Sequence, residues 1–481
     1  MSKKPLHKYV KIEKSRADEV AAFLFELGNQ FLKVENASGA GDCFRYSLDL
    51  NDKLRESVHN LGVIYSLQGN YEGSYRMFKE CARMNPKGAF MAKICASEAA
   101  RKLGNLDESM AILRECQRED PENVLVITNM SMILYDQGRL AEALDWTNRA
   151  LEKSPTDPHL MLNKTLVNMT YGHWRENWSL YEFCLSYRKN NARMKNLKMG
   201  DAWDGREMEG QSLLVISDQG HGDCVQFARY LKEAKALGKF AKLAYLVQVD
   251  LVDLMRQVEG VDEVFGFGEK QSYEYDAFSS LLGIMRVLQV GPDDCWRPPH
   301  IKTDPQLDLV WKTRLDAMWD GKSKKVGIVW GGDPKHGNDT NRSLPLAQFL
   351  KFTDVPGIQW FSFQVGPPVK QLHALGQDCG IADLGSEFRT FSDTSSALKE
   401  MDLLISCDTS TPHLAAGMGK EVWWLISQPG EWRVLLDVNH SLWYDDSRLF
   451  RQPVPKDWDS AVASVRSALV EWIRAKEYAS A

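Results

Sequence analysis

Apolar positions at helical spacing run through the first third of the chain, and glycines and prolines interrupt them at a fixed interval. The glycines follow one another at 35, 34 and 34 residues and are Gly69, Gly104, Gly138 and Gly172. The prolines recur with nearly the same period, at Pro86, Pro121 and Pro155. Each glycine turns one helix into the next and each proline closes the second helix, which predicts a series of stacked helical hairpins.

A period near 34 residues is typical of tetratricopeptide repeats. The unit at 55–88 fits their consensus at Leu61, Gly62, Tyr65, Gly69, Tyr71, Phe78 and Pro86. A more degenerate unit precedes it, with Leu27, Gly28, Phe31, Ala40 and Phe44 in register, and a last unit starts near residue 158. We therefore predict about five repeats between residues 21 and 191. Their concave groove is expected to hold a protein or peptide, although a spacer or a dimer surface would show the same pattern.

Beyond residue 191 the apolar positions form short runs instead, which predicts buried strands. The runs begin with "SLLVIS" at 212–217 and include "KLAYLVQV", "VDEVFGFGE", "KKVGIVWGG", "IQWFSFQVG", "MDLLISCDTS" and "EVWWLIS". Helical segments alternate with them, which favours parallel sheets wound in right-handed units. A strand followed by a glycine-rich turn occurs near 217 and again near 330. We therefore predict two Rossmann-like halves that bind ligands beyond the carboxyl ends of their strands.

The predicted fold is an α-solenoid of tetratricopeptide hairpins followed by an α/β half of two Rossmann-like domains. The expected division is a leader at 1–20, the repeats at 21–191, a linker at 192–210, a first Rossmann-like domain at 211–318, a second at 319–452 and a C-terminal helix at 453–481.

Charge and composition exclude several classes of protein. The 59 basic and 65 acidic side chains leave a net charge of −6, spread along the chain, which argues against a nucleic-acid binder. No apolar run reaches the roughly 18 residues of a membrane span, and the charged start "MSKKPLHKYVKIEKSR" is unlike a secretory signal. The 9 cysteines show no C-x-x-C spacing, so neither a zinc cluster nor a disulfide framework is expected. A reducing cytoplasm fits this composition best.

The first candidate site residues lie at the turn after the 212–217 run. The string "QGHGDC" places Gly220, His221, Gly222 and Asp223 there, just before a predicted helix. Glycines allow the backbone to approach a ligand closely, and Asp223 could face that ligand. Aspartate is also a favoured cap residue, so Asp223 could instead only close the helix N-terminus.

A second candidate is the polar loop "GGDPKHGNDTNRSLPL" at 331–346, which follows another buried run. It carries Lys335 and Arg342, and two cations near a helix start suit a diphosphate. A solvated surface loop would have the same composition.

The third candidate is "SCDTSTPHLAAGMGK" at 406–420, where a buried run opens into a helix. Backbone amides and hydroxyls gather at this helix start, where an anion would be favoured. The residues are Asp408, Thr409, Ser410, Thr411 and His413, the histidine about one turn into the helix. A capped helix with a structural histidine is the alternative.

A D-x-D string, which can hold a metal in sugar-nucleotide enzymes of another fold, occurs at Asp457 and Asp459. It follows "RQPVPK" and opens the last predicted helix, so we expect Asp457 to be a helix cap.

In combination, the motifs resemble those of bacterial tetratricopeptide-repeat glycosyltransferases. The second half of those proteins is similar to the ADP-heptose:lipopolysaccharide heptosyltransferases and, more distantly, to O-GlcNAc transferase. The matching strings are G-x-G-D at 220–223, N-R-S-[IL]-P-L at 341–346 and D-T-x-x-x-H-L-A-x-x-x-G-K at 408–420. The similarity runs from about residue 21 to 470 and implies the two-domain GT-B fold.

The resemblance implies that a sugar passes from a nucleotide-sugar donor to a hydroxyl with inversion, without a metal or other cofactor. Asp223 would be the general base, and His221, which stands where the family has a small or apolar residue, could tune it or replace it. Helix-start amides at 408–413 with Lys335 or Arg342 would stabilise the leaving diphosphate. The other expected donor-binding residues are Gly220, Gly222, Gln364, Asp408, Thr409, Ser410, Thr411 and His413.

Two other functions stay open at this point. One is a tetratricopeptide adaptor whose second half binds a nucleotide without turnover. The other is a true lipopolysaccharide heptosyltransferase, against which the long repeat arm counts because a saccharide acceptor hardly needs a solenoid.

Overall fold

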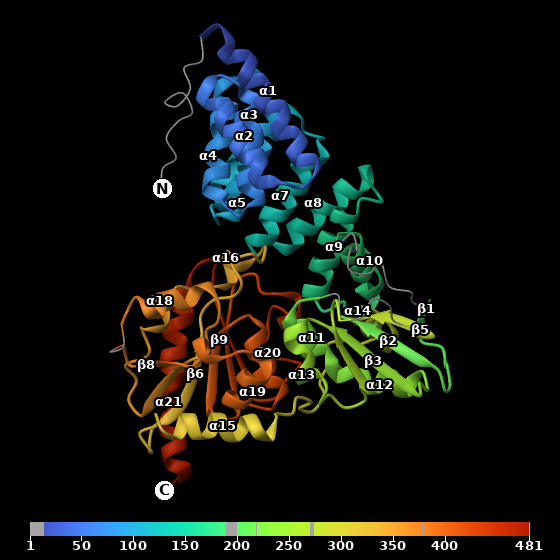
Figure 1. Ribbon diagram of the computed structural model, residues 1–481, viewed down its shortest axis with the longest axis vertical. Helices are drawn as coiled ribbons and strands as arrows, with labels where there is room; N and C mark the ends of the chain where they lie inside the picture. The colour runs from blue at the N-terminus through green and yellow to red at the C-terminus, as the bar shows by residue number, and fades with distance from the viewer. Residues whose placement is uncertain (1–13, 189–199, 218, 270–273, 377–378, 481) are drawn as a thin grey trace. The chain divides into compact units, whose positions relative to one another are not determined.

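The computed structural model describes residues 14–188, 200–217, 219–269, 274–376 and 379–480. The chain divides into two compact units, Met1–Pro155 and Thr156–Ala481 (Figure 1). None of the helices in these described ranges is both long and apolar enough to cross a membrane.

Consecutive helical hairpins make up the described part of the first unit. They are α1 (Lys14–Lys33) with α2 (Ala37–Leu50), α3 (Arg55–Leu67) with α4 (Tyr71–Met84), α5 (Phe90–Lys102) with α6 (Leu106–Glu119), and α7 (Val124–Asp136) with α8 (Leu140–Lys153). This series confirms the helical repeats that the glycine and proline spacing predicted.

Glycine has two separate roles in these hairpins. Within a hairpin it lets the helices approach, since a Cβ on Gly28 would lie 2.6 Å from the Phe44 ring and one on Gly62 would lie 3.0 Å from the Phe78 ring. Between the helices it adopts a left-handed conformation, as Gly69 does with φ of +73°. The repeat consensus therefore reflects close packing at one position and a backbone turn at the other.

A fifth hairpin belongs to the second unit. It consists of α9 (Pro158–Thr170) and α10 (Trp178–Arg188), joined through Gly172 and the short η3 (Arg175–Asn177). The sequence series therefore continues past residue 155, while the packing assigns its last member to the α/β part of the chain.

The first lobe of the second unit is built on a parallel five-stranded sheet of order β1-β5-β2-β3-β4. Its strands are β1 (Asp201–Ala202), β2 (Ser212–Ile216), β3 (Lys242–Val247), β4 (Glu263–Gly266) and β5 (Ala277–Ser280). Its helices are α11 (His221–Phe227), α12 (Leu231–Leu237), α13 (Val252–Met255) and α14 (Leu281–Leu288), with the short η4 (Ala228–Tyr230) and η5 (Val249–Leu251). The interior strands are almost wholly buried, as the apolar runs predicted.

The second lobe is built on a parallel six-stranded sheet of order β11-β10-β9-β6-β7-β8. Its strands are β6 (Lys324–Val329), β7 (Ile358–Ser362), β8 (Ile381–Asp383), β9 (Leu403–Cys407), β10 (Val422–Ile426) and β11 (Ser447–Arg451). Numbered from β6, this is the Rossmann order 3-2-1-4-5-6. Its helices include α16 (Asp339–Arg342), α17 (Leu346–Phe349), α18 (Lys370–His373), α19 (Phe391–Lys399) and α20 (Ser410–Gly417).

In each sheet the order of the strands changes direction next to one strand, which is β2 in the first lobe and β6 in the second. The reversal lies between β2 and β5 in the first lobe and between β6 and β9 in the second. The helices that follow β2 and β9, α11 and α20, pack against each other between the two sheets (Figure 1). The two Rossmann-like lobes predicted from the sequence are confirmed, and the helices that follow the carboxyl ends of β2 and β9 adjoin.

Two further helices complete the second unit. The helix α15 (Pro305–Asp316) packs on α19, with the rings of Trp311 and Phe388 4.9 Å apart. The last helix, α21 (Trp458–Ser480), packs on β11 and α17. Asp457 caps it by accepting a hydrogen bond from the Ser460 amide at 3.1 Å, and Asp459 pairs with Lys351 Nζ at 2.5 Å. The D-x-D string thus has the capping role expected of it.

An aromatic cluster joins the fifth hairpin to the loop that follows β10. The ring of Trp432 lies 5.3 Å from that of Trp174, 5.4 Å from Trp178 and 5.9 Å from Tyr181. Trp443, from the same loop, stacks on Trp174 at 5.0 Å. On the first lobe, Trp178 Nε1 donates to the backbone oxygen of Val290 at 2.7 Å. The hairpin therefore packs on both lobes.

Replacing Trp174 with alanine should destabilise the second unit by about 3–5 kcal/mol, because this ring is fully buried in the cluster. Urea unfolding followed by tryptophan fluorescence measures the change, since Trp146 is the single tryptophan in the sequence of the first unit. The matched control is Trp296→Ala, which removes a ring that is 47% exposed and should cost about 1 kcal/mol or less. Equal losses for the two variants would show that the fifth hairpin is not packed as described.

Candidate functional site

The polar residues of the three sequence motifs meet in one cleft, beside the points where the two sheets reverse their strand order. The cleft has a volume of about 560 Å³. All twelve residues named from the sequence line it, namely Gly220, His221, Gly222, Asp223, Lys335, Arg342, Gln364, Asp408, Thr409, Ser410, Thr411 and His413. Stretches far apart in the chain thus form a single site.

Gly222 allows the helix starts of the two lobes to approach each other. A Cβ at this position would lie 3.1 Å from Cδ2 of His413 and 3.5 Å from Cα of Ser410. The contact with the His413 ring would be tighter than ordinary packing, so a side chain at position 222 would press on α20. The glycine of the first motif therefore has a role in joining the lobes.

Asp223 is held at both of its carboxylate oxygens. One oxygen accepts a hydrogen bond from the Gly220 amide at 3.0 Å, which completes a capping arrangement at the start of α11. The other forms an ion pair with the guanidinium of Arg433, which also pairs with Glu431. Although burial opposes it, these carboxylates raise the pKa of Arg433, so the arginine stays charged. Asp223 both caps its helix and faces the cleft.

His221 is oriented by contacts from both lobes. Its Nε2 lies 3.0 Å from both carboxylate oxygens of Asp250, in the η5 turn after β3. Its ring stacks on Phe391, at the start of α19, with centroids 5.3 Å apart and planes 12° apart. The hydrogen bond with His221 lowers the pKa of Asp250, so this carboxylate stays ionised and accepts the bond.

The loop after β6 brings cations to the cleft. The nearest carboxylate oxygen to Arg342 is that of Asp339 at 3.5 Å, and Arg342 Nε is buried without a hydrogen-bond partner among the described residues. Lys335 is exposed, and within the described ranges no carboxylate lies within 4.0 Å of its Nζ. Both cations line the cleft and are available to an anion there.

Gln364 lines the cleft, but its side chain is committed to the protein backbone. Its Oε1 accepts from the amides of Trp330 at 3.0 Å and Gly331 at 2.8 Å. Its Nε2 donates to the carbonyls of Gly331 and Val365, each at 2.8 Å. The side chain therefore shapes the loop that follows β6, and its contact with a donor remains a prediction.

The start of α20 offers backbone donors to the cleft. Thr409 occupies the cap position with extended backbone, and no side chain caps the helix. The amides of Ser410 and Thr411 in the first turn are therefore free of side-chain caps, and Pro412 has no amide hydrogen. Thr409 Oγ1 is also buried without a partner among the described residues. These groups make the helix start suitable for an anion.

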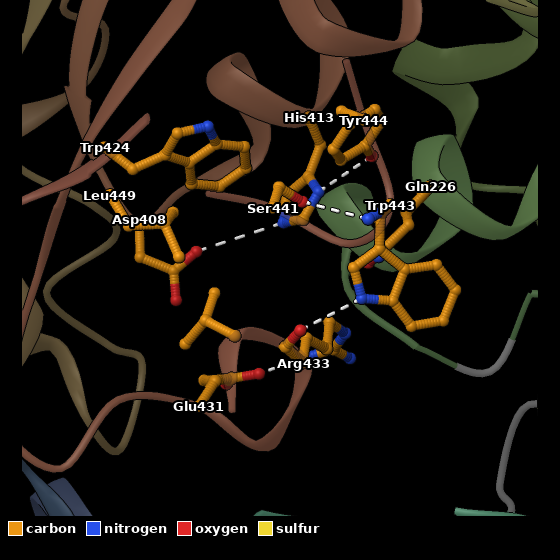
Figure 2. Close-up of a pocket in the computed structure, with 11 residues that line it drawn as sticks. Gln226, Asp408, His413, Trp424, Glu431, Arg433, Ser441, Trp443, Tyr444 and Leu449 are labelled. Atoms are coloured by element: carbon orange, nitrogen blue, oxygen red, sulfur yellow. Dashed lines mark hydrogen bonds and ion pairs between the residues drawn. The ribbon is translucent and has the colours of Figure 1, made fainter. Parts of the chain in front are cut away.

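A small chamber of about 20 Å³ adjoins the cleft and shares Asp408, His413, Glu431 and Arg433 with it; Figure 2 shows the side chains that line the chamber. His413 Nδ1 lies 3.0 Å from the Tyr444 hydroxyl, and His413 Nε2 lies 3.9 Å from Asp408 (Figure 2). Burial and the nearby Arg433 hold the pKa of His413 well below its usual range, so its ring is neutral.

Burial and the nearby Glu431 raise the pKa of Asp408 to about 7. Close to neutral pH, this carboxyl group can therefore hold a proton and donate a hydrogen bond, as well as accept one. In the described part of the chain, no group of three or more His, Cys, Asp and Glu side chains is placed to hold a metal ion.

The sequence motifs did not indicate several residues that shape the site. They are Asp250, Phe391, Glu431, Arg433 and Tyr444. Each is an ordinary residue in its local sequence and gains its importance from a long-range contact. A partial signal existed in "GEWRV", where an arginine adjoins a tryptophan in a loop expected after a strand.

Protonation of Asp408 should make folding more favourable at lower pH, since its native pKa of about 7 exceeds the ordinary aspartate value of about 3.9. This contribution is fully present below about pH 4 and is lost as the pH rises to about 7. Asp408→Asn lacks it, so the stability of the variant relative to the native chain should increase across that window. Urea unfolding at a series of pH values measures the difference, and a difference that does not change with pH would contradict the assignment.

Comparison with known proteins supports the repeats. Two models described as tetratricopeptide repeat match residues 55–85 and 100–161. Protein FlbA of Caulobacter vibrioides is 22% identical over 438 residues, which cover 86% of this chain and 72% of FlbA. The described hairpins and these matches show that the first part of the chain is a tetratricopeptide-repeat array.

Among solved structures, a glycosyl transferase family 9 protein from Veillonella parvula DSM 2008 matches 55% of this chain and 98% of its own, with a TM-score of 0.41 and 10% identity. YrrB, a tetratricopeptide protein with an unusual peptide-binding site, matches 38% of this chain and 93% of its own, with a TM-score of 0.28 and 16% identity.

Proposed function

We propose that the chain is a glycosyltransferase that moves a sugar from a nucleotide-sugar to a hydroxyl acceptor with inversion. The observation that carries the proposal is the convergence of all three motifs on one cleft between two Rossmann-like lobes. These motifs lie in the same order as in the glycosyltransferases that the sequence resembles. A cleft at the carboxyl ends of both parallel sheets is where such a fold binds nucleotides.

The donor's phosphate groups are proposed to bind at the start of α20. The uncapped amides of Ser410 and Thr411 supply partial positive charge, and Arg342 and Lys335 supply full charges from the other side of the strand reversal. Charge that develops on the departing phosphate would be stabilised by these groups, which are already in place. No step in this account calls on a metal.

A proton acceptor is needed for the hydroxyl that attacks the anomeric carbon. Asp223 and His221 both line the cleft next to the proposed phosphate site. A base on the face of the sugar opposite the leaving group leads to inversion. The sugar hydroxyls could be bound by Asp408, which can donate as well as accept a hydrogen bond.

The repeats are proposed to bind the protein or peptide that carries the acceptor, or a partner that delivers it. One observation favours the alternative of an adaptor that binds nucleotide without turnover. Asp223, the base that the resemblance implies, is occupied by Arg433. Turnover of any sugar nucleotide would eliminate this alternative.

The first test is the binding of a panel of nucleotides and their sugar conjugates, followed by thermal unfolding with and without EDTA. A ligand that binds only the folded chain stabilises it by about 2.7 kcal/mol at 100 times its Kd. We expect one nucleotide to stabilise the chain equally well in EDTA. The absence of any stabilisation across the panel would contradict the proposed function.

Arg342→Gln should weaken binding of that nucleotide about tenfold or more, because it removes charge-assisted hydrogen bonds worth about 1.5–3 kcal/mol. Isothermal titration measures the change in Kd. The matched control is Arg256→Gln, which removes an exposed arginine paired with Asp253 and should leave Kd unchanged. Equal affinity of the Arg342 variant and the native chain would place the phosphates elsewhere.

A further inference from the structure

We infer that His221, oriented by Asp250, accepts the proton of the attacking hydroxyl, and that Asp223 positions Arg433. This inference rests on the proposed function and assigns the proton acceptor that the function leaves open. It also assigns a role to Asp250, which lies in a different strand-to-helix turn from the G-x-G-D motif.

Asp223 is engaged by donors at both of its carboxylate oxygens. The Gly220 amide donates to one oxygen and the Arg433 guanidinium to the other. Arg433 is itself largely buried, with its side chain 12% exposed and its Cζ 4.6 Å from the centroid of the Trp432 ring. Each oxygen of Asp223 could still accept a second hydrogen bond, but a proton taken up by Asp223 would remove the charge that faces Arg433 and leave this cation with a single ionised carboxylate, Glu431. Such a carboxylate is suited to hold a cation in place.

His221 has the opposite arrangement. One ring nitrogen, Nε2, faces both oxygens of Asp250 at 3.0 Å, and one face of the ring covers Phe391. Asp250 is on the first lobe and Phe391 on the second, so the imidazole is fixed from both sides of the cleft. The side chain is still 38% exposed and lines the cleft. A substrate can therefore reach a histidine that is already oriented.

The partner at Nε2 determines where the lone pair lies. Because the ionised Asp250 carboxylate can only accept, Nε2 carries the hydrogen of the neutral ring. The other nitrogen, Nδ1, then has the lone pair, and within the described ranges no protein donor is recorded for it. Enzymes that activate a hydroxyl with a carboxylate and an imidazole use the same three groups, with the roles of the two ring nitrogens exchanged relative to His221.

The proposed transfer occurs in one step. The acceptor oxygen forms a bond to the anomeric carbon while its proton passes to Nδ1 of His221. The bond from the anomeric carbon to the phosphate oxygen breaks, and its electron pair leaves with the phosphate. The imidazolium produced is stabilised by Asp250, and the new negative charge on phosphate is stabilised by Arg342 and the α20 amides. No oxidant, reductant or further reactant is required.

The test compares single variants in steady-state transfer with the donor found by titration. His221→Ala should lower kcat by about 10²–10⁴ with donor Kd unchanged, and added imidazole should restore part of the lost rate. The matched control is His373→Ala, because His373 forms the same kind of pair with Asp383 at 2.8 Å but does not line the cleft. The His373→Ala variant should keep the native rate of transfer, and added imidazole should not change that rate.

Asp223→Asn separates the two candidate acceptors. If Asp223 only positions Arg433, this variant loses rate, but imidazole does not restore it and His221→Ala still lowers kcat further in the double variant. Full activity of His221→Ala, in a native chain that does turn over, would overturn this inference alone. Failure of the native chain to use any sugar nucleotide would overturn the proposed function, and the role of His221 with it.

Asp250 acts through His221, so its test needs a readout of the ring itself. In the ¹⁵N-labelled native chain, the His221 signal should show hydrogen on Nε2, and its assignment follows from its loss in His221→Ala. Asp250→Asn should produce a mixture of tautomers and lower kcat at least about tenfold. Asp253→Asn, an exposed aspartate in the next helix, is the control and should change neither. An unchanged tautomer in Asp250→Asn would contradict the positioning role.

Discussion

The site depends on one largely buried cation, Arg433, which lies between carboxylates of the two lobes. Asp223 comes from the first lobe and Glu431 from the same loop as the arginine in the second. Taking a guanidinium out of water is costly, and only well-placed anions repay the cost. Since Asp223 lies across the cleft, Arg433 keeps both of its carboxylate partners only while the lobes hold this arrangement. The ion pair thereby ties the electrostatics of the site to its shape.

The fifth hairpin supports this arrangement by packing on the loop that carries Arg433. Trp432, next to Arg433 in the chain, is enclosed by Trp174, Trp178 and Tyr181 of the fifth hairpin. Aromatic rings in such edge-to-face contacts resist displacement because each buries a large area against the others. The loop that carries Arg433 is thus held by the last hairpin.

Local patterns in the sequence were sufficient for the hairpins, the main strands and most of the cleft. The glycine period marks two features within each repeat unit, a turn and a close contact between helices such as that of Gly62 with Phe78. Both features depend on residues that are near one another in the sequence. The apolar runs at β2, β3, β6, β9 and β10 mark strands that are buried on both faces. The strands β1, β5, β8 and β11 were not predicted, since β1, β5 and β8 are short and lack a long apolar run, and β11 has two arginines among its five residues. Because the strands are parallel, the motif residues that follow them lie at one edge of each sheet. This placement can be predicted without knowing the side-chain contacts.

The roles of individual residues required the structure because they are set by partners elsewhere in the chain. Asp223 and Arg433 are 210 residues apart, and His221 and Asp250 are 29 apart. In the sequence, the aspartate of G-x-G-D was the natural base and the adjoining histidine a departure from the family. The proposed roles invert that order, because a guanidinium engages the aspartate while a carboxylate orients the histidine. A histidine oriented by a neighbouring carboxylate has the chemistry of a proton acceptor, and this assignment would leave Asp223 to hold Arg433 across the cleft.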